Sequence, residues 1–142
     1  MNNMKPIQVK VSIYNISAER FQNFDKPFLK TQITTNLNII DAKKHGDRVE
    51  VPFVFTVNYA PSLAQLSMKG KAYILGEKNE MEKIQENYRK NHVLPSVVAQ
   101  SISNVVFLES INIARTLNIP PPIPLPKVSQ SKVKERKTTA YI

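Results

Sequence analysis

The sequence contains no cysteine and no tryptophan, and only three of its 142 residues are glycine. Without cysteine the chain has no disulfides, no thiolate metal ligands and no thiol nucleophiles. The three scattered glycines form none of the glycine-rich motifs that cradle phosphate groups. No secretory segment follows Met1, and no run approaches the roughly 18 apolar residues of a membrane-spanning helix. We therefore expect a cytoplasmic protein without a membrane span.

Histidine is also scarce, and the catalytic motifs built on histidine or on paired carboxylates are missing. His45 and His92 lie far apart in the sequence, without a zinc-ligand spacing. Three carboxylates gather at residues 41, 47 and 50, but the basic residues beside them make a solvated turn the simpler interpretation. No G-x-S-x-G nucleophile motif is present. We expect no metal, no cofactor and no catalytic residue, and hence a protein that is not an enzyme.

Acidic residues are few relative to basic ones. Eleven Asp and Glu stand against twenty Lys and Arg, which gives a formal net charge of +9. The hydrophobic content of 42% is nevertheless ordinary for a globular protein, and 142 residues suffice for one core. A charge of this sign favours partners that carry phosphate groups, or acidic membrane and protein surfaces.

A period-two pattern of apolar residues runs through the first half of the chain. The alternation covers residues 7–13, 29–39, 49–59 and 66–74, and it predicts four half-buried strands. The turn His45-Gly46-Asp47 favours a hairpin before the third strand, because a Gly-Asp pair suits a tight turn. Four strands in succession predict an antiparallel sheet with one solvated face.

The apolar period becomes helical after residue 76. Met81, Ile84 and Tyr88 form one stripe of an otherwise charged segment, which predicts an amphipathic helix. Pro95 suits the first turn of a second helix that runs to about Leu117 and is apolar nearly all round. One sheet covers only one side of such a helix, so we expect a homo-oligomer with this helix in the interface. The expected interface residues are Val98, Ile102, Val105, Val106 and Ile111. The alternative is a helix enclosed between the sheet and the first helix of one chain.

Proline and basic residues dominate the C-terminal part. Five prolines between residues 120 and 126 fix φ and block helix formation, so we expect the globular part to end near residue 126. Residues 127–142 hold five basic residues and one acidic residue, a net charge of +4. We therefore predict one α+β domain over residues 1–126, in which a four-stranded antiparallel sheet precedes two helices, and an extended basic tail over residues 127–142.

Basic residues at solvated strand positions and in the tail are the positive signal of function. Lys69 and Lys71 share a strand face two residues apart, as expected of a strand that follows phosphates. The alternative for lysines on strands is protection against aggregation, and for the tail it is a solubilising role. We interpret the pattern as a non-catalytic protein that binds RNA or the ribosome. The expected nucleic-acid contacts are Lys43, Lys44, Arg48, Lys69, Lys71, Lys127, Lys132, Lys134, Arg136 and Lys137.

The C-terminal half also carries a family resemblance. Its residues are Leu94-Pro95, Ile102-Ser103, Val105, Glu109, Arg115 and the proline-rich run from Ile119 to Pro126. In these residues, and in the order of four strands and two helices, the chain resembles SecB-like proteins, in which a proline opens a long helix and the proline-rich exit ends in Leu-Pro. The resemblance implies an antiparallel sheet backed by helices, assembly through the long helix and an edge strand, and an apolar groove that holds unfolded polypeptide without ATP.

The chain departs from the secretion-linked members of that family in its charge. Those members look acidic and have an acidic continuation, whereas this chain is basic and continues with Lys127-Val128-Ser129. We therefore place RNA or ribosome binding first on this scaffold. The alternative is an ATP-independent holdase chaperone that binds unfolded polypeptide or preprotein in an apolar groove lined by the side of Phe53, Phe55 and Tyr59 and by the second helix. An antitoxin-linked chaperone or a dimeric partner-binding module is a third hypothesis, for which the sequence has no separate signature.

Overall fold

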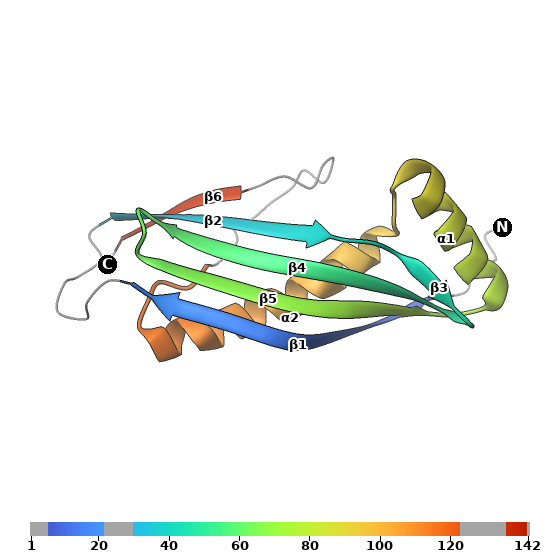
Figure 1. Cartoon of the computed structure of the whole chain (residues 1–142), viewed down its shortest axis with the longest axis horizontal. Helices are drawn as coiled ribbons and strands as arrows, with labels where there is room; N and C mark the ends of the chain where they lie inside the picture. Colours follow the sequence, from blue (N-terminus) through green and yellow to red (C-terminus); the bar gives the residue numbers. More distant parts are fainter. Residues whose placement is uncertain (1–5, 22–29, 123–135, 142) are drawn as a thin grey trace.

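An antiparallel sheet is the main layer of the protein. The structure, a computed structural model, describes residues 6–21, 30–122 and 136–141. The strands are β1 (Gln8–Arg20), β2 (Lys30–Ile39), β3 (Lys43–His45), β4 (Arg48–Ala60), β5 (Ala64–Leu75) and β6 (Arg136–Tyr141). The order β1-β5-β4-β2-β6 places five strands in a row, and the short β3 also pairs with β4. Figure 1 shows the resulting long, twisted sheet.

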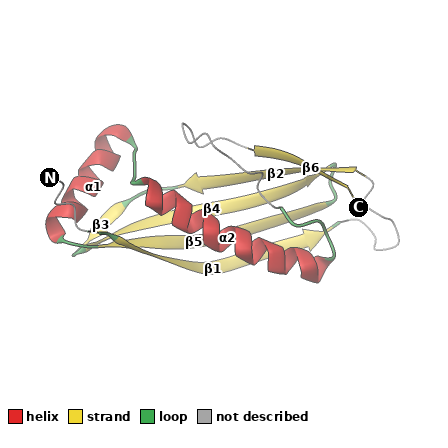
Figure 2. Ribbon diagram, turned by 180° about the vertical axis from the view of Figure 1, so that it is seen from behind, coloured by secondary structure: helices red, strands yellow, loops and turns green. Residues whose placement is uncertain are grey.

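Two helices follow β5, namely α1 (Lys78–Asn91) and α2 (Ser96–Leu117). The longer α2 crosses one face of the sheet and contacts β1 and β5, whereas α1 lies at the end of the sheet that carries β3 (Figure 2). His92 and Asn118 adopt the left-handed conformation and end the two helices. The predicted α+β class, with an antiparallel sheet and two helices, is confirmed.

The apolar residues at alternate positions of the central strands form the core. The odd-numbered residues of β4 from Val49 to Tyr59 are at most 2% exposed, and Leu66, Met68 and Ile74 of β5 are fully buried beside them. Burial of each such side chain stabilises the fold by roughly 1.5–3 kcal/mol. Met81 of α1 and Ile102 of α2 add to the same core. The other residues of β4 and β5 therefore face away from the helices.

A turn and a proline shape the region around β3. Gly46 has a φ of +64° in the turn between β3 and β4, as the predicted hairpin requires. Pro52 lies within β4 at the place where β2 has ended, opposite Ile40, whose amide donates to the Pro52 carbonyl at 2.9 Å. In a strand the amide and the carbonyl of one residue point to the same side. The amide hydrogen that proline lacks would therefore point toward the space between the end of β2 and the start of β3. Neither strand pairs with Pro52 there, so the loss of this donor costs little.

The sheet is larger than the predicted four strands. The four long strands lie close to the expected segments, but β3 and β6 are additional. Arg136–Tyr141 were expected in the extended tail and instead form β6, which pairs with β2. The stretch Thr138-Thr139-Ala140-Tyr141 has good strand propensity, and β6 covers an edge of the sheet that β2 would otherwise leave open. The rest of the tail, with Lys127, Lys132 and Lys134, lies outside the described residues.

Candidate nucleic-acid interface

The sheet face turned away from α2, here called the outer face, carries basic residues from three neighbouring strands. The strand register sets Tyr73 of β5 opposite Lys10 of β1 and also opposite Glu50 of β4. Lys71 and Lys69 follow on the same side of β5, because alternate residues of a strand share a face. Arg48 of β4 lies on this side as well. We call Lys10, Arg48, Lys69 and Lys71 the basic cluster.

One carboxylate balances part of this charge. Glu50 accepts from Lys71, with Nζ at 3.2 Å from Oε1, and lies beside His45, with Nε2 at 3.3 Å from Oε2. Ion pairs at a protein surface contribute little to stability, with typical values of about 0–1 kcal/mol. Lys10 and Lys69 make no ion pair within the described part of the chain. The basic cluster therefore keeps an excess of positive charge.

An aromatic ring lies within the basic cluster. The guanidinium of Arg48 lies over the Tyr73 ring, with Cζ 4.8 Å from the ring centroid, which is a cation–π geometry. The parity of the strands already marks Lys10 as a solvated basic position, since it falls between the apolar Val9 and Val11, but the list of expected contacts includes only Arg48 of these three residues. Tyr73 was missed. Parity could have found it, since Tyr73 and Lys71 are two positions apart on one strand.

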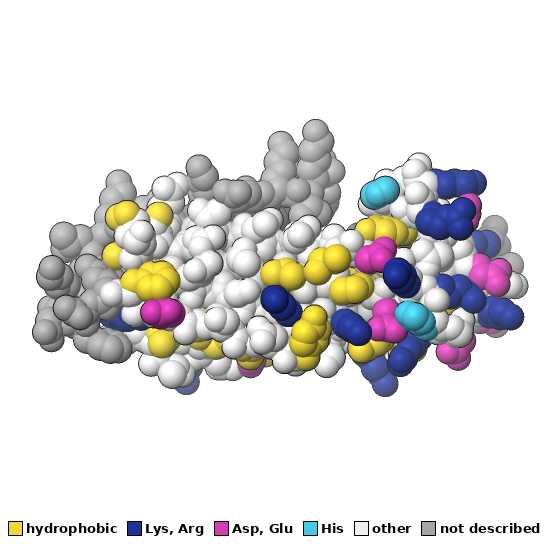
Figure 3. Space-filling model, in the orientation of Figure 1, with side chains coloured by type: hydrophobic (Ala, Val, Ile, Leu, Met, Phe, Trp, Pro, Cys, Tyr) yellow, Lys and Arg dark blue, Asp and Glu magenta, His cyan; other side chains and the backbone are white. Residues whose placement is uncertain are grey.

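The remainder of the outer face is polar but almost uncharged. Its residues include Thr34, Asn36, Thr56, Asn58, Gln65 and Ser67. Figure 3 shows Lys and Arg side chains over the half of this face near β3 and over α1, with few charged side chains over the other half. Charged side chains, basic ones with some acidic ones among them, are therefore concentrated at the β3 end of the outer face.

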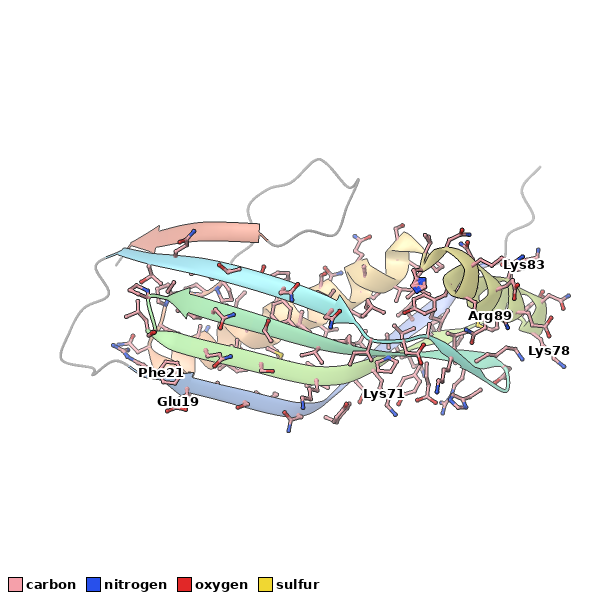
Figure 4. All side chains as sticks on the ribbon, turned by 45° about the horizontal axis from the view of Figure 1, so that its top comes forward. Glu19, Phe21, Lys71, Lys78, Lys83 and Arg89 are labelled. Carbon is pink, nitrogen blue, oxygen red and sulfur yellow. The ribbon has the colours of Figure 1, made fainter. Side chains whose placement is uncertain are left out.

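The basic residues of α1 form a separate group from those of the sheet. Figure 4 shows Lys71 on the sheet and Lys78, Lys83 and Arg89 on α1. Glu86 partly balances the helix, because it lies 4.0 Å from Arg89 and 3.5 Å from Lys90. The helix mixes both signs of charge, so the outer face of the sheet is the stronger candidate for phosphate binding.

The predicted nucleic-acid contacts do not all lie together. Lys43 lies on the outer face and pairs with Asp41 at 3.9 Å, in register with Glu50. Lys44 faces the other side, in register with the buried Val49, and its amide donates to Gln85 Oε1 on α1. Lys44 therefore does not belong to the basic cluster. Arg136 and Lys137 lie in β6, and the structure describes only their backbone.

The expected interface residues of α2 divide into two groups. Val98, Ile102 and Val106 are at most 1% exposed and belong to the core of this same chain. Val105 and Ile111 are only half-buried, and the exposed fractions of Val97 and Leu108 reach 39% and 64%. The helix is long and apolar enough to cross a membrane by length and composition alone, but its buried stripe packs against the sheet. The residues that a second copy could reach are therefore those of the exposed side.

The aromatic residues considered for a polypeptide groove are not open to solvent. Phe53, Phe55 and Tyr59 are at most 2% exposed, and Phe55 meets Phe107 of α2 edge to face at 5.3 Å between ring centroids. The Tyr59 hydroxyl donates to the Pro120 carbonyl at 2.6 Å, and burial raises the pKa of this hydroxyl above its usual range. These three rings stabilise the core and do not line a groove.

Small-molecule chemistry has little support in the described part of the chain. Residues 6–21, 30–122 and 136–141 contain no group of three or more His, Cys, Asp or Glu side chains placed to hold a metal ion. A shallow hollow beside the α1–α2 connection, lined by Lys83, Ile84, Asn87, Val93, Leu94 and Pro95, has a volume of about 210 Å³. Typical ligand pockets measure roughly 300–1,000 Å³. The extended outer face is therefore the larger candidate surface.

Comparison with known proteins adds no family assignment. No family model, curated protein or solved structure matches this chain.

Proposed function

We propose that this protein binds RNA, as a ribosome-associated or other ribonucleoprotein component, through the basic cluster on the outer face. The observation that carries the proposal is the strand register, which sets Lys10 of β1 opposite Tyr73 of β5, on the same side of the sheet as Lys71 and Lys69. Lysine contacts to phosphate supply affinity that is independent of base sequence. Binding at this face needs no metal, no cofactor and no catalytic group.

The basic tail is proposed to add affinity. Lys127, Lys132 and Lys134 follow the globular part, and Arg136–Tyr141 pair with β2. These three lysines would bring further positive charge to bound RNA. Replacing the three lysines with glutamine tests this better than deleting residues 127–142, because deletion also removes β6.

The test of the proposed function is direct binding of purified protein to a labelled RNA oligonucleotide, followed by fluorescence anisotropy. We expect binding that weakens steeply as salt rises, and weaker binding by Lys69→Gln than by wild type. Lys83→Gln on α1 removes the same charge from a position outside the cluster and serves as the matched control. Absence of RNA binding at low salt, or equal losses in the two variants, would contradict the proposal.

The second candidate is an ATP-independent holdase on a SecB-like scaffold. Its support is the order of four long strands before two helices, together with exposed apolar side chains on β1, directly after β1 and on α2. These are Tyr14, Ile16, Phe21, Val97 and Leu108, which are between 39% and 64% exposed. The resemblance also implies assembly through the long helix and an edge strand, and β1 is such an edge. A holdase would suppress aggregation of an unfolded client equally well in wild type and in Lys69→Gln, whereas an RNA-binding component would show no such activity.

A further inference from the structure

We infer that the outer face binds single-stranded RNA in preference to duplex RNA, with one base stacked on the Arg48–Tyr73 pair and neighbouring phosphates held by Lys69 and Lys71. The inference rests on the proposed RNA binding and adds the form of RNA that is bound and the group that receives a base.

The Arg48–Tyr73 pair supplies the surfaces on which unpaired bases stack. The Arg48 Cζ lies 4.8 Å from the centroid of the Tyr73 ring, so a planar cation covers an aromatic ring on the open face of the sheet. Aromatic rings and guanidinium planes are the groups that stack on splayed bases in single-stranded RNA. In a duplex the bases are already stacked on each other, and their faces are closed to side chains.

Apolar surface continues beside this pair. Pro52 and Val54 of β4 face outward and are only half-buried. Ile40, whose amide donates a hydrogen bond to the Pro52 carbonyl, is 56% exposed. Figure 3 shows hydrophobic side chains interspersed with Lys and Arg over this half of the outer face. The ribose-phosphate exterior of a duplex gains nothing from apolar contacts, whereas an unpaired base buries apolar surface on them.

The lysine positions fit a single strand that runs along β5. Lys69 and Lys71 are two positions apart on β5, which corresponds to about 6.8 Å along a strand. This separation is comparable with the distance between successive phosphates of an extended single strand. Lys69 has no ion-pair partner among the described residues, so its charge is available to a phosphate, and Lys71 shares Glu50 with His45.

The test compares a labelled single-stranded RNA of about twelve nucleotides with a hairpin duplex of the same composition, by fluorescence anisotropy. We expect wild type to bind the single strand at least roughly tenfold more tightly than the duplex. Arg48→Lys keeps the charge but removes the planar group, so single-strand affinity should fall about tenfold while the salt dependence stays the same. Tyr73→Leu should cause a similar loss, and Tyr73→Phe should retain wild-type affinity because the ring remains.

The outcomes separate this inference from the proposed function. If single strand and duplex bind equally, and Arg48→Lys changes neither while Lys69→Gln weakens both, base stacking is overturned and phosphate binding stands. If no RNA binds but an acidic, apolar-rich peptide does, the partner is a protein and both ideas are overturned. Circular dichroism melting of each variant shows whether the fold is intact; if Tyr73→Leu fails to fold, Arg48→Lys alone decides the result.

Discussion

Replacing Lys10 and Lys69 with glutamine should lower the salt sensitivity of RNA binding by a calculable amount. Both side chains are exposed, and neither makes an ion pair within the described residues, so each can neutralise a phosphate. For single strands each neutralised phosphate adds about 0.7 to the slope of log affinity against log salt, so the double variant should lose about 1.4 from that slope. Between about 50 and 200 mM salt this difference amounts to about sevenfold in affinity.

The assay is anisotropy of a labelled single-stranded RNA, titrated at several salt concentrations. Arg115→Gln is the matched control, because Arg115 is exposed on α2, on the opposite side of the sheet, and makes no ion pair among the described residues. Lys71→Gln should change the slope by less than 0.7, roughly, because Glu50 already compensates that charge. An unchanged slope in the double variant, or a loss of about 0.7 from the slope in the single variant Arg115→Gln, would refute the assignment of phosphate contacts to the outer face.

Three further predictions concern stability and assembly. A Cβ at Gly70 would lie 2.4 Å from the Ser12 carbonyl oxygen, so Gly70→Ala should lower the free energy of unfolding in urea by about 3 kcal/mol. Gly46→Ala should lower it by only about 1 kcal/mol, because there only the positive φ is unfavourable for alanine. Equal losses in the two variants would contradict this. Burial raises the pKa of the Tyr59 hydroxyl, so this group ionises at a lower pH in the unfolded chain than in the folded protein. Its contribution to the free energy of unfolding should therefore be fully present below a pH of about 10 and decrease above it, by at most about 1.4 kcal/mol per pH unit. Tyr59→Phe should reduce this decrease. Ile102→Asp should unfold the chain, since Ile102 is fully buried. Leu108→Asp should keep the fold and, if copies associate through the exposed side of α2, reduce the mass measured by light scattering. A folded Ile102→Asp variant would argue against the packing of α2 on the sheet.

The alternation of apolar residues was sufficient to predict the long strands and their buried sides. In β4 the odd-numbered residues from Val49 to Tyr59 are all apolar and all buried, although Pro52 and Val54 add apolar residues on the other side. The helix period identified α1 and α2 for the same reason, since Met81 and Ile84 are the buried residues of α1. These elements were predictable because one periodicity determines both the local conformation and the buried side.

The pairing of distant segments could not be read from periodicity. The pattern within Arg136–Tyr141 is compatible with a strand, but only the open edge of β2 provides a partner, and that edge is a property of the assembled sheet. The same limit applies to the candidate site. Lys10 and Tyr73 are 63 positions apart and become neighbours only through the β1–β5 register, so the composition of the candidate site depends on strand order.

Burial within one chain also altered the interpretation of α2. A helix that is apolar nearly all round predicts cover on more than one side, yet the sheet takes up only the stripe through Val98, Ile102 and Val106. Sequence alone does not say which stripe the chain covers itself. We therefore expect self-association through the exposed side of α2, which carries Val97 and Leu108, and not through those three residues.

The most direct test of RNA binding through the outer face is sedimentation of the tagged protein from its native cells at low salt. We expect wild type and Arg115→Gln to sediment with ribosomes or other ribonucleoprotein, and we expect ribonuclease treatment to release them. The Lys10→Gln, Lys69→Gln double variant should remain largely in the soluble fraction while melting at the wild-type temperature. Sedimentation that resists ribonuclease and is unchanged in the double variant would contradict the account, and unfolded polypeptides in that complex would favour the holdase.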